Sequence, residues 1–480
     1  MGFYHLPVEI VSFIFELLDN QSKLQSRLVC KEWTCLLDSH NLAHNVVLRN
    51  KTFKYVKNLK SSSSCKHFKK LVVRGFSADI SKLAKTKSRS PLALSPEKLV
   101  FERHRSRLPK TCLEENVSAL IRLNPDISSL VFTPGSLNSI QSLRVRGLVL
   151  GHLKHLQISV SLYGDSESVL LETLTRIKMP SLTDLQLEAG IYNLNNFVND
   201  QTFIELVKFL IAVRSGVKKL KLRHVLSSRF DWHLMLLPLT LARALPQAEL
   251  DTLIDELASI QVEELSLMFI PRDGILDYGL GLELLRCQTN LKKFHMEIFP
   301  GRDSHDFKIC TKSAILKNTE TLQSLEVSCN GYGDRCWLLA NYIDELWQAL
   351  NYCRVLETLD LASFWIRRLL FPWPETIKHL MLGIIKPNIL SDLKPALPRL
   401  ETLLFNGFAH EDPPDFDSIP RHLLVLLSSR SLKMIKWRAE DENLDALNDN
   451  PELHILRSYE LSRYDRKYDF ITVTKIPIIP

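Results

Sequence analysis

The 480-residue sequence contains no long apolar run and no paired cysteines. A membrane-spanning helix needs ~20 apolar residues, and no run approaches that length, Leu234 to Ala242 being among the longest. The first residues carry no basic stretch and no signal-type cleavage site, so we expect a chain that is not secreted. The nine cysteines include no C-x-x-C pair, which is typical of reduced thiols in the cytosol or nucleus and not of a disulfide framework.

The motifs of common enzymes are also missing. There is no glycine-rich loop ending in Gly-Lys-Ser/Thr and no H-E-x-x-H pair, which excludes a phosphate cradle and a metalloprotease site of those kinds. The segment from Gly164 to Ser168 approaches a nucleophile elbow, but it lacks the second glycine that the tight turn needs. His152 and His155 precede an expected strand, and we interpret them as surface residues. We therefore predict no active site, no metal and no cofactor.

The positive net charge of +7 comes from one stretch. Between Lys51 and Cys112 there are seventeen lysines and arginines against Asp79, Glu97 and Glu102, a local net charge of +14, so the remainder carries 7 − 14 = −7. Such a stretch could bind an acidic partner, including nucleic acid. It could instead be a solvated loop, and we favour the loop because aromatic residues are too few to stack single-stranded bases.

The first forty residues have the pattern of three short helices. Pro7 and Glu9 suit a first helical turn, where a missing N–H and a carboxylate are both favourable. A second helical segment runs around Leu24 to Val29, and a third around Trp33 to Leu37. Helices this short bury too little apolar surface to be self-sufficient, so an exposed apolar surface that waits for a partner is plausible. The first helix repeats its apolar residues at helical spacing: Ile10, Phe13, Ile14, Leu17 and Leu18.

This stretch resembles an F-box over about residues 5 to 45. The resemblance rests on the order Leu-Pro-x-Glu-Ile from Leu6, and on Arg-Leu-Val-Cys-Lys-x-Trp ending at Trp33. F-box modules dock on a Skp-type adaptor, which links them to a cullin-RING ubiquitin ligase. The alternative is that the same residues merely form the core of a helical N-terminal cap. The resemblance implies that the adaptor interface is carried or shaped by Leu6, Pro7, Ile10, Ile14, Leu28, Val29 and Trp33.

Two cysteines and two histidines in the same region, Cys30, Cys35, His40 and His44, are potential zinc ligands. A zinc finger separates its two ligand pairs by about a dozen residues, whereas four residues separate Cys35 from His40. In a continuous helix Cys30 and His44 would lie about 20 Å apart, at ~1.5 Å per residue. We therefore expect no zinc site.

The remainder of the chain repeats the unit apolar-x-x-apolar-x-apolar. The last two apolar residues of a unit point the same way on a strand, into a core, and the residue between them points outward. Helix-like apolar spacing often precedes the unit, so each repeat is a strand, a turn and a helix that stacking neighbours bury. The middle anchors are Leu71, Leu99 (a weaker copy), Leu130, Leu156, Leu185, Leu220, Leu265, Phe294, Leu325, Leu359, Leu380, Leu403 and Ile435. The expected outward residues are Lys221, Ser266, His295, Glu326, Asp360, Met381, Leu404 and Lys436.

This body resembles a leucine-rich-repeat solenoid over roughly residues 65 to 440. Its mean period, (435 − 71)/12 or about 30, exceeds the usual 20–29, and the asparagine expected after each strand occurs only as Asn330. We therefore expect an irregular horseshoe, which resembles the irregular repeats of fungal-type F-box proteins. The fold class is α/β, with a small all-α F-box before the solenoid. The expected segments are 1–48 (F-box), 49–126 (basic connector and first repeats), 127–440 (solenoid) and 441–480 (acidic segment and C-terminal cap). The acidic stretch is Glu440 to Glu452, and the β-type run from Phe470 to Ile479 could seal the last repeat.

Together the two resemblances imply a substrate-recognition subunit of an SCF-type ubiquitin ligase, non-catalytic and located in the cytoplasm, the nucleus or both. Its partners would be a Skp-type adaptor, through it a cullin-RING ligase, and an unknown protein substrate, with no membrane. Two alternatives stay open. One is an adaptor-bound scaffold without a degradative role, and the other is a binder of nucleic acid or acidic partners through residues 51–112. The residues that bind substrate are not evident from the sequence.

Overall fold

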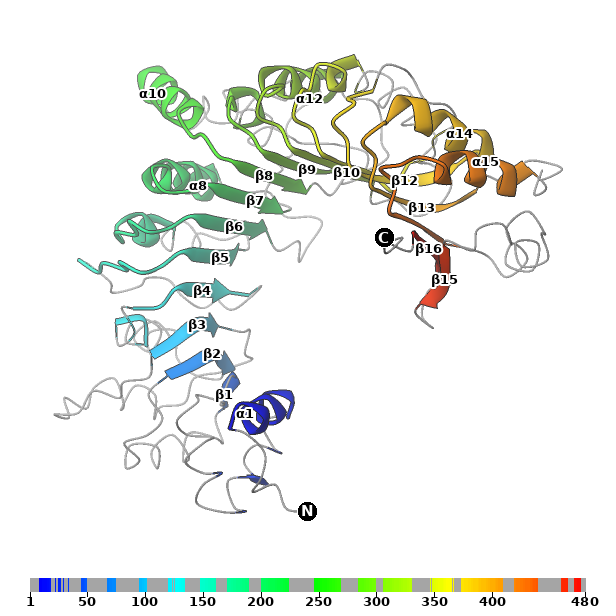
Figure 1. The fold of residues 1–480 in the computed structure, drawn as a ribbon. Coiled ribbons are helices and arrows are strands. Elements are labelled where there is room, and N and C mark those ends of the chain that lie inside the picture. The colour runs from blue at the N-terminus through cyan, green and yellow to red at the C-terminus, as the bar shows by residue number, and fades with distance from the viewer. Residues whose placement is uncertain are drawn as a thin grey trace, which may run out of the picture. The chain divides into compact units, whose positions relative to one another are not determined.

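The computed structural model forms two compact units, Met1–Asp231 with Pro238–Leu257, and Trp232–Leu237 with Ala258–Pro480 (Figure 1). The division into four segments expected from the sequence stays a prediction. The structure describes residues 8–18, 22, 25–26, 29, 33, 45–49, 67–74, 95–101, 120–122, 124, 126–133, 147–160, 171–189, 200–223, 246–268, 284–298, 305–329, 346, 348–364, 366, 373–408, 418–438, 459–464 and 470–475.

The first unit is a parallel sheet preceded by a helix. Helix α1 (Val8–Leu17) lies where the sequence predicts the first helix. Seven strands then pair in chain order, all parallel. They are β1 (Asn45–Arg49), β2 (His67–Arg74), β3 (Ser95–Phe101), β4 (Ser129–Phe132), β5 (His155–Val160), β6 (Asp184–Ala189) and β7 (Lys219–Arg223).

Two helices accompany the last strands of this unit. Helix α8 (Asp200–Val213) contains the helical pattern that the sequence predicts before β7, and α10 (Gln247–Ala258) follows that strand. Ion pairs connect the two helices: Lys208 lies 3.7 Å from Glu249, and Arg214 lies 3.4 Å from Glu256. The unusually long interval between Leu220 and Leu265 is thus partly used for an additional helix.

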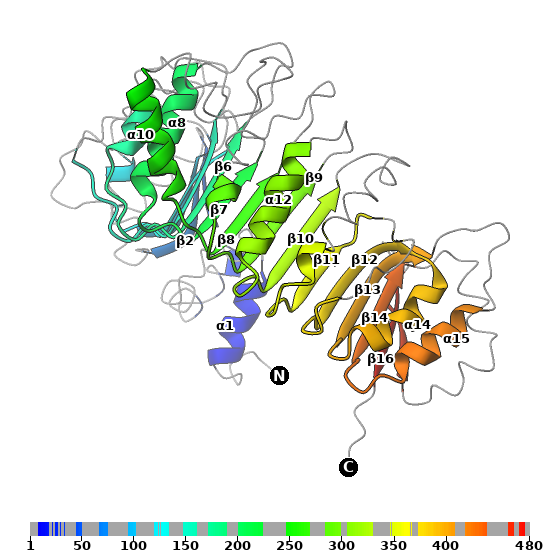
Figure 2. The same cartoon turned by 90° about the horizontal axis from the view of Figure 1, so that it is seen from above.

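The second unit continues the same design and ends differently. Strands β8 (Glu264–Met268), β9 (Lys293–Ile298), β10 (Ser324–Cys329), β11 (Thr358–Leu361), β12 (His379–Ile385), β13 (Thr402–Phe408) and β14 (Met434–Arg438) pair in parallel. Helices α12 (His305–Lys317), α14 (Pro387–Ala396) and α15 (Ser418–Leu427) lie over one face of these strands (Figure 2). Within the described residues, no helix has the length and apolar character to span a membrane.

The chain closes the second unit with an antiparallel hairpin. Strand β16 (Phe470–Lys475) pairs antiparallel with β14, and β15 (Tyr459–Tyr464) pairs with β16. The predicted β-type run therefore covers the edge of the last parallel strand, as expected. Trp437 on β14 stacks on Phe405 of β13, with ring centroids 5.7 Å apart, and adds an apolar contact at this end. The acidic stretch from Glu440 to Glu452 lies outside the described residues.

The repeat anchors form the core, as the sequence predicts. Each of the thirteen middle anchors lies on a strand, and none is more than 2% exposed. The registers place these anchors side by side: Leu156 pairs with Leu185 in the first unit, and Leu325 pairs with Leu359 in the second. A column of buried leucines on neighbouring strands is what stacking requires, because one repeat cannot cover its own apolar face.

The position between the two inward anchors behaves as predicted from Lys221 to Lys436, where all eight outward residues are partly exposed. It differs on β2, β3 and β4. There the same position holds Val72, Val100 and Val131, which form a buried apolar cluster of their own. The outward face is thus apolar at the start of the sheet and polar further along the first unit.

Backbone hydrogen bonds lock the registers where the strands begin. The carbonyl oxygen of Glu357, for example, accepts hydrogen bonds from the N–H groups of Lys378 and His379, at 2.8 and 2.9 Å. Since one oxygen receives two consecutive amides of the next repeat, a slip of one residue would break both bonds. The same double acceptance occurs at Ser128, Lys154, Thr183, Glu263, Lys292, Gln323, Lys378 and Glu401.

Buried carboxamides form a second set of cross-repeat bonds, which the sequence did not predict. Nε2 of Gln288 donates to the oxygen of Ile260 at 2.8 Å, and its Oε1 accepts from the N–H of Val262 at 2.9 Å. Asn318 repeats this one repeat later, where its Oδ1 accepts from the N–H of Leu291 at 2.7 Å. The sequence predicts no asparagine ladder after the strands. In the structure, the side-chain carboxamides that bond one repeat to the next lie before the strands instead.

Candidate functional site

Helix α1 has two adjacent apolar stripes, of which one is buried and the other is exposed. Val11 and Phe15, one turn apart, are buried, and the ring of Trp33 packs edge-on against Phe15 with centroids 5.0 Å apart. The neighbouring stripe is Ile10, Ile14 and Leu17, at the i, i+4, i+7 spacing of one helix face. It remains accessible: Ile10 is 46% exposed and Leu17 is 73% exposed, while Ile14 is partly buried.

The residues that the resemblance assigns to an adaptor interface therefore divide into groups. Ile10 and Val29 are exposed apolar side chains, Val29 to 63%, as a docking surface requires. Trp33 is instead partly buried, and its ring packs against Phe15 on the buried side of α1. Leu6, Pro7 and Leu28 lie outside the described residues. Leu17 was not predicted as an interface residue, although its spacing of seven from Ile10 is visible in the sequence.

The other motifs of the N-terminal region cannot be placed in full. Cys30, Cys35, His40 and His44 lie outside the described residues, as does most of the basic stretch 51–112 apart from β2 and β3. Among the residues that the structure describes, no three or more His, Cys, Asp or Glu side chains gather as a metal site would require.

A row on the first unit has the composition of a catalytic triad but not its contacts. Ser129, His155 and Asp184 occupy neighbouring registers on β4, β5 and β6. Nδ1 of His155 lies 2.9 Å from Oδ2 of Asp184. Oγ of Ser129 is buried without a hydrogen-bond partner, so the contact between nucleophile and base that the chemistry needs is missing. His152, in contrast, is an exposed surface residue, as predicted.

The outward face of the second unit carries a row of side chains that run across its strands. We name this set of side chains the central row. It contributes one residue per strand at matched registers, and from β8 to β13 these residues are Ser266, His295, Glu326, Asp360, Met381 and Leu404. The imidazole of His295 is held from both sides: Nδ1 lies 3.1 Å from Oγ of Ser266, and Nε2 lies 3.4 Å from both Oγ of Ser328 and Oε1 of Glu326.

Asp360 is the most constrained acid of the central row. Its Oδ1 accepts a hydrogen bond from the N–H of Ala362 at 2.9 Å. Burial raises the pKa of this carboxyl above its ordinary value, the Ala362 bond opposes that shift, and the nearby Glu326 raises the pKa further. The backbone that follows is fixed as well, because Asn406 donates to the oxygen of Ala362 and the N–H of Ile366 donates to Ile384.

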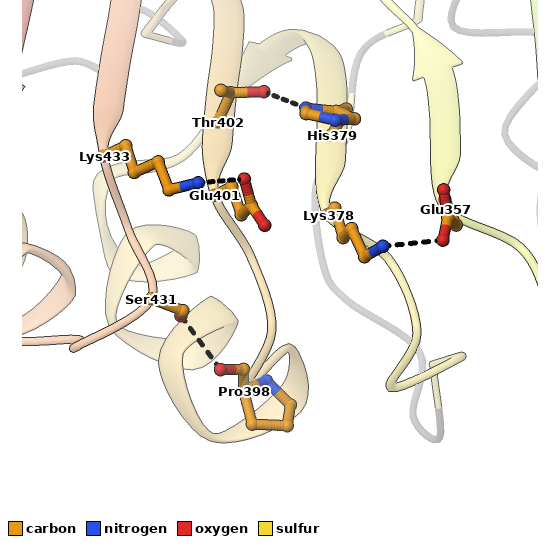
Figure 3. Close-up of polar contacts among 8 residues, drawn as sticks. All are labelled: Glu357, Lys378, His379, Pro398, Glu401, Thr402, Ser431 and Lys433. Atoms are coloured by element: carbon orange, nitrogen blue, oxygen red, sulfur yellow. Dashed lines mark hydrogen bonds and ion pairs between the residues drawn. The ribbon is translucent and has the colours of Figure 1, made fainter.

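The positions that precede the central row on the strands are, in contrast, neutralised by cross-strand pairs. Nζ of Lys378 lies 2.6 Å from Glu357, and Nζ of Lys433 lies 2.6 Å from Glu401 (Figure 3). The bond from Lys433 lowers the pKa of Glu401. Further along the sheet Glu263 pairs with Lys292, and Glu264 with Lys293.

Figure 3 also shows uncharged bonds beside these pairs. Nδ1 of His379 lies 2.8 Å from Oγ1 of Thr402, and Oγ of Ser431 donates to the oxygen of Pro398 at 2.9 Å. The starts of β12, β13 and β14 are therefore satisfied internally, both in charge and in hydrogen bonding. These strand starts therefore offer no unpaired charge among the residues shown that would attract a charged partner.

Comparison with known proteins identifies one region. Residues 3–49 match the model of the F-box-like family. This range contains α1, its exposed stripe and Val29. No curated protein matches the chain.

Proposed function

We propose that the chain is the substrate-recognition subunit of an SCF-type cullin-RING ubiquitin ligase, and that its N-terminal module docks on a Skp-type adaptor. The observation that carries this proposal is the exposed stripe of α1 within the F-box-like region. Ile10, Ile14 and Leu17 would lose their contact with water on docking. Full burial of one such side chain contributes about 1.5–3 kcal/mol.

The repeating body would then be a leucine-rich-repeat solenoid that holds a target protein. The stacked parallel strands, the buried anchor columns and the strand–helix alternation support this role. An open sheet face whose outward side chains are in register from strand to strand is a rigid surface on which many partners can be recognised.

The mechanism would be proximity. By binding the adaptor at one end and a target at the other, the chain would raise the effective concentration of the target at the ligase, with no chemistry of its own. Such a protein would act in the cytoplasm or the nucleus.

Capture of the adaptor tests the proposal directly. The full chain carrying Ile10→Asp and Leu17→Asp should lose at least ten-fold of the recombinant Skp-type adaptor that wild type captures. The matched control is Ile309→Asp on α12, an apolar residue of similar exposure (49%) far from α1 in sequence, which should capture as wild type does. Equal capture by all three proteins would reject the interface.

The fate of bound targets separates a ligase subunit from an adaptor-bound scaffold. Proximity labelling with the chain in cells identifies the proteins that it approaches. Their half-lives should shorten when the wild-type chain is expressed and not when the Ile10→Asp/Leu17→Asp variant is. Half-lives that are the same with and without the chain would favour the scaffold.

A further inference from the structure

The central row carries an unbalanced negative charge at its middle. Glu326 and Asp360 stand side by side on β10 and β11, whose residues include no lysine or arginine. On the adjoining strands, Lys293 is paired with Glu264, and β12 contains no lysine or arginine. Within the described residues, the contact to Glu326 comes from the imidazole of His295, 3.4 Å away, so two carboxylates face one imidazole and the row stays net negative.

Next to this acidic pair the central row becomes apolar. Met381 and Leu404 occupy the following two registers and are partly exposed. Strands in a sheet are ~4.8 Å apart, so Leu404 lies two strands, or about 10 Å, from Asp360. The row therefore offers two anionic groups and then two apolar ones in a fixed order.

The acidic pair is held in place although its charge is unfavourable for folding. Asp360 is positioned by the Ala362 N–H, and the segment after it packs closely on β12: a Cβ added to Gly383 would lie 1.9 Å from the Phe364 oxygen. Two neighbouring carboxylates on one sheet face repel each other. A cationic partner would relieve this repulsion, whereas the flanking pairs, such as Lys378 with Glu357, have no such need.

We propose that the central row binds a peptide segment of the target protein that carries a lysine or arginine on Glu326 and Asp360 and an apolar side chain on Met381 and Leu404. This inference rests on the proposed function and specifies its substrate class. An extended peptide advances ~3.3 Å per residue and alternates its side chains, so two side chains on the same face lie two or four residues apart, about 7 or 13 Å, which brackets the ~10 Å spacing of the row. Charge complementarity supplies the orientation, and the apolar contact supplies burial.

Selection from a random 12-residue peptide library displayed on phage, with the full chain as bait, tests this assignment. The selected peptides should be enriched in a lysine or arginine with an apolar residue two to four positions away. Synthetic copies of these peptides should bind Glu326→Gln/Asp360→Asn at least ten-fold more weakly than wild type, and should also bind Met381→Asp more weakly. The matched control, Glu357→Gln/Glu401→Gln in the paired positions, should bind within two-fold of wild type.

Three results would contradict the proposed peptide site. No selected peptide, selected peptides without the basic residue, or equal binding by Glu326→Gln/Asp360→Asn would overturn the proposal. Thermal unfolding of each variant shows whether a loss of binding reflects a loss of fold, since both acid substitutions preserve shape. Capture of the adaptor is the separate readout for the proposed function. Retained capture with lost peptide binding by Glu326→Gln/Asp360→Asn supports a distinct site. If the wild-type chain binds the selected peptides and captures no adaptor, only the docking proposal is contradicted.

Discussion

Nδ2 of Asn318 donates a hydrogen bond to the backbone oxygen of Gln288, 3.0 Å away, and the side chain of Gln288 in turn bonds the backbone at Ile260 and Val262. Both carboxamides are 1% exposed. Two successive repeats are thus bonded to the repeat before them by a buried amide. This connection is independent of the anchor columns and of the strand ladder.

Replacement of Asn318 by leucine should destabilise the second unit by about 3 kcal/mol. The apolar side chain would leave the Leu291 N–H and the Gln288 oxygen buried without partners, and each such group costs about 1–3 kcal/mol. The urea midpoint of the full chain measures the loss. The same substitution at exposed Asn290 serves as the control and should leave the midpoint nearly unchanged; equal midpoints for both variants would contradict the role of the amide.

Gly383→Ala should be strongly destabilising, by about 3 kcal/mol or more, because overpacking against backbone cannot be relieved by a rotamer change. The added Cβ would lie 1.9 Å from the Phe364 oxygen. Gly151→Ala is the control, since its Cβ would meet no atom within 4 Å. Thermal unfolding compares the two, and a Gly383→Ala protein that unfolds at the wild-type temperature would show that the segment after β11 is not packed as described.

Cys353 should be almost inert to alkylation in the folded chain. Burial raises the pKa of its thiol to about 12, and the thiolate is the reactive form. At pH 8 the thiolate fraction should be about a thousand-fold below that of an ordinary thiol. Iodoacetamide labelling followed by peptide mass spectrometry gives the rate, with the same cysteine in urea as the reference. A native rate close to the rate in urea would refute the burial.

Asp360→Asn should raise the thermal stability at pH 7, and the gain should shrink toward pH 3.5. The pKa of Asp360 is raised in the folded state, so the folded chain retains a proton that the unfolded chain loses. Stability therefore falls as the pH rises through the window between the ordinary and the raised pKa. Asparagine avoids this loss and can still accept the Ala362 bond through its amide oxygen.

Glu401→Gln provides the opposite sign for the same experiment. The pKa of Glu401 is lowered by Lys433, so its stabilising effect is present above the ordinary pKa and disappears as the pH falls through the lowered value. The variant should therefore lose a little stability at pH 7 and nothing at low pH. If both variants change stability in the same direction at pH 7, the two carboxylates do not sit in contrasting environments.

Much of the architecture was predictable because it depends on local periodicity. Alternating apolar residues specify which side of a strand is buried whatever lies beside it, so the anchors at Leu156 or Leu403 could be identified from their spacing alone. The same holds for α1, for the helix before β7 and for the run at Phe470. The two buried carboxamides were not predictable, since Gln288 and Asn318 resemble surface residues until the neighbouring repeat supplies their partners.

The candidate sites, too, were predictable only in part from the sequence. The amino-acid order alone was sufficient to indicate an F-box-like module, an apolar first helix and outward residues such as Glu326 and Asp360. Only the tertiary structure decided that Val11 and Phe15 are buried while Ile10 and Leu17 stay exposed, because helical spacing makes both stripes equally apolar. Only the cross-strand registers decided that Lys378 neutralises Glu357 while Glu326 and Asp360 stand together, because residues over twenty positions apart in sequence become neighbours solely through strand pairing.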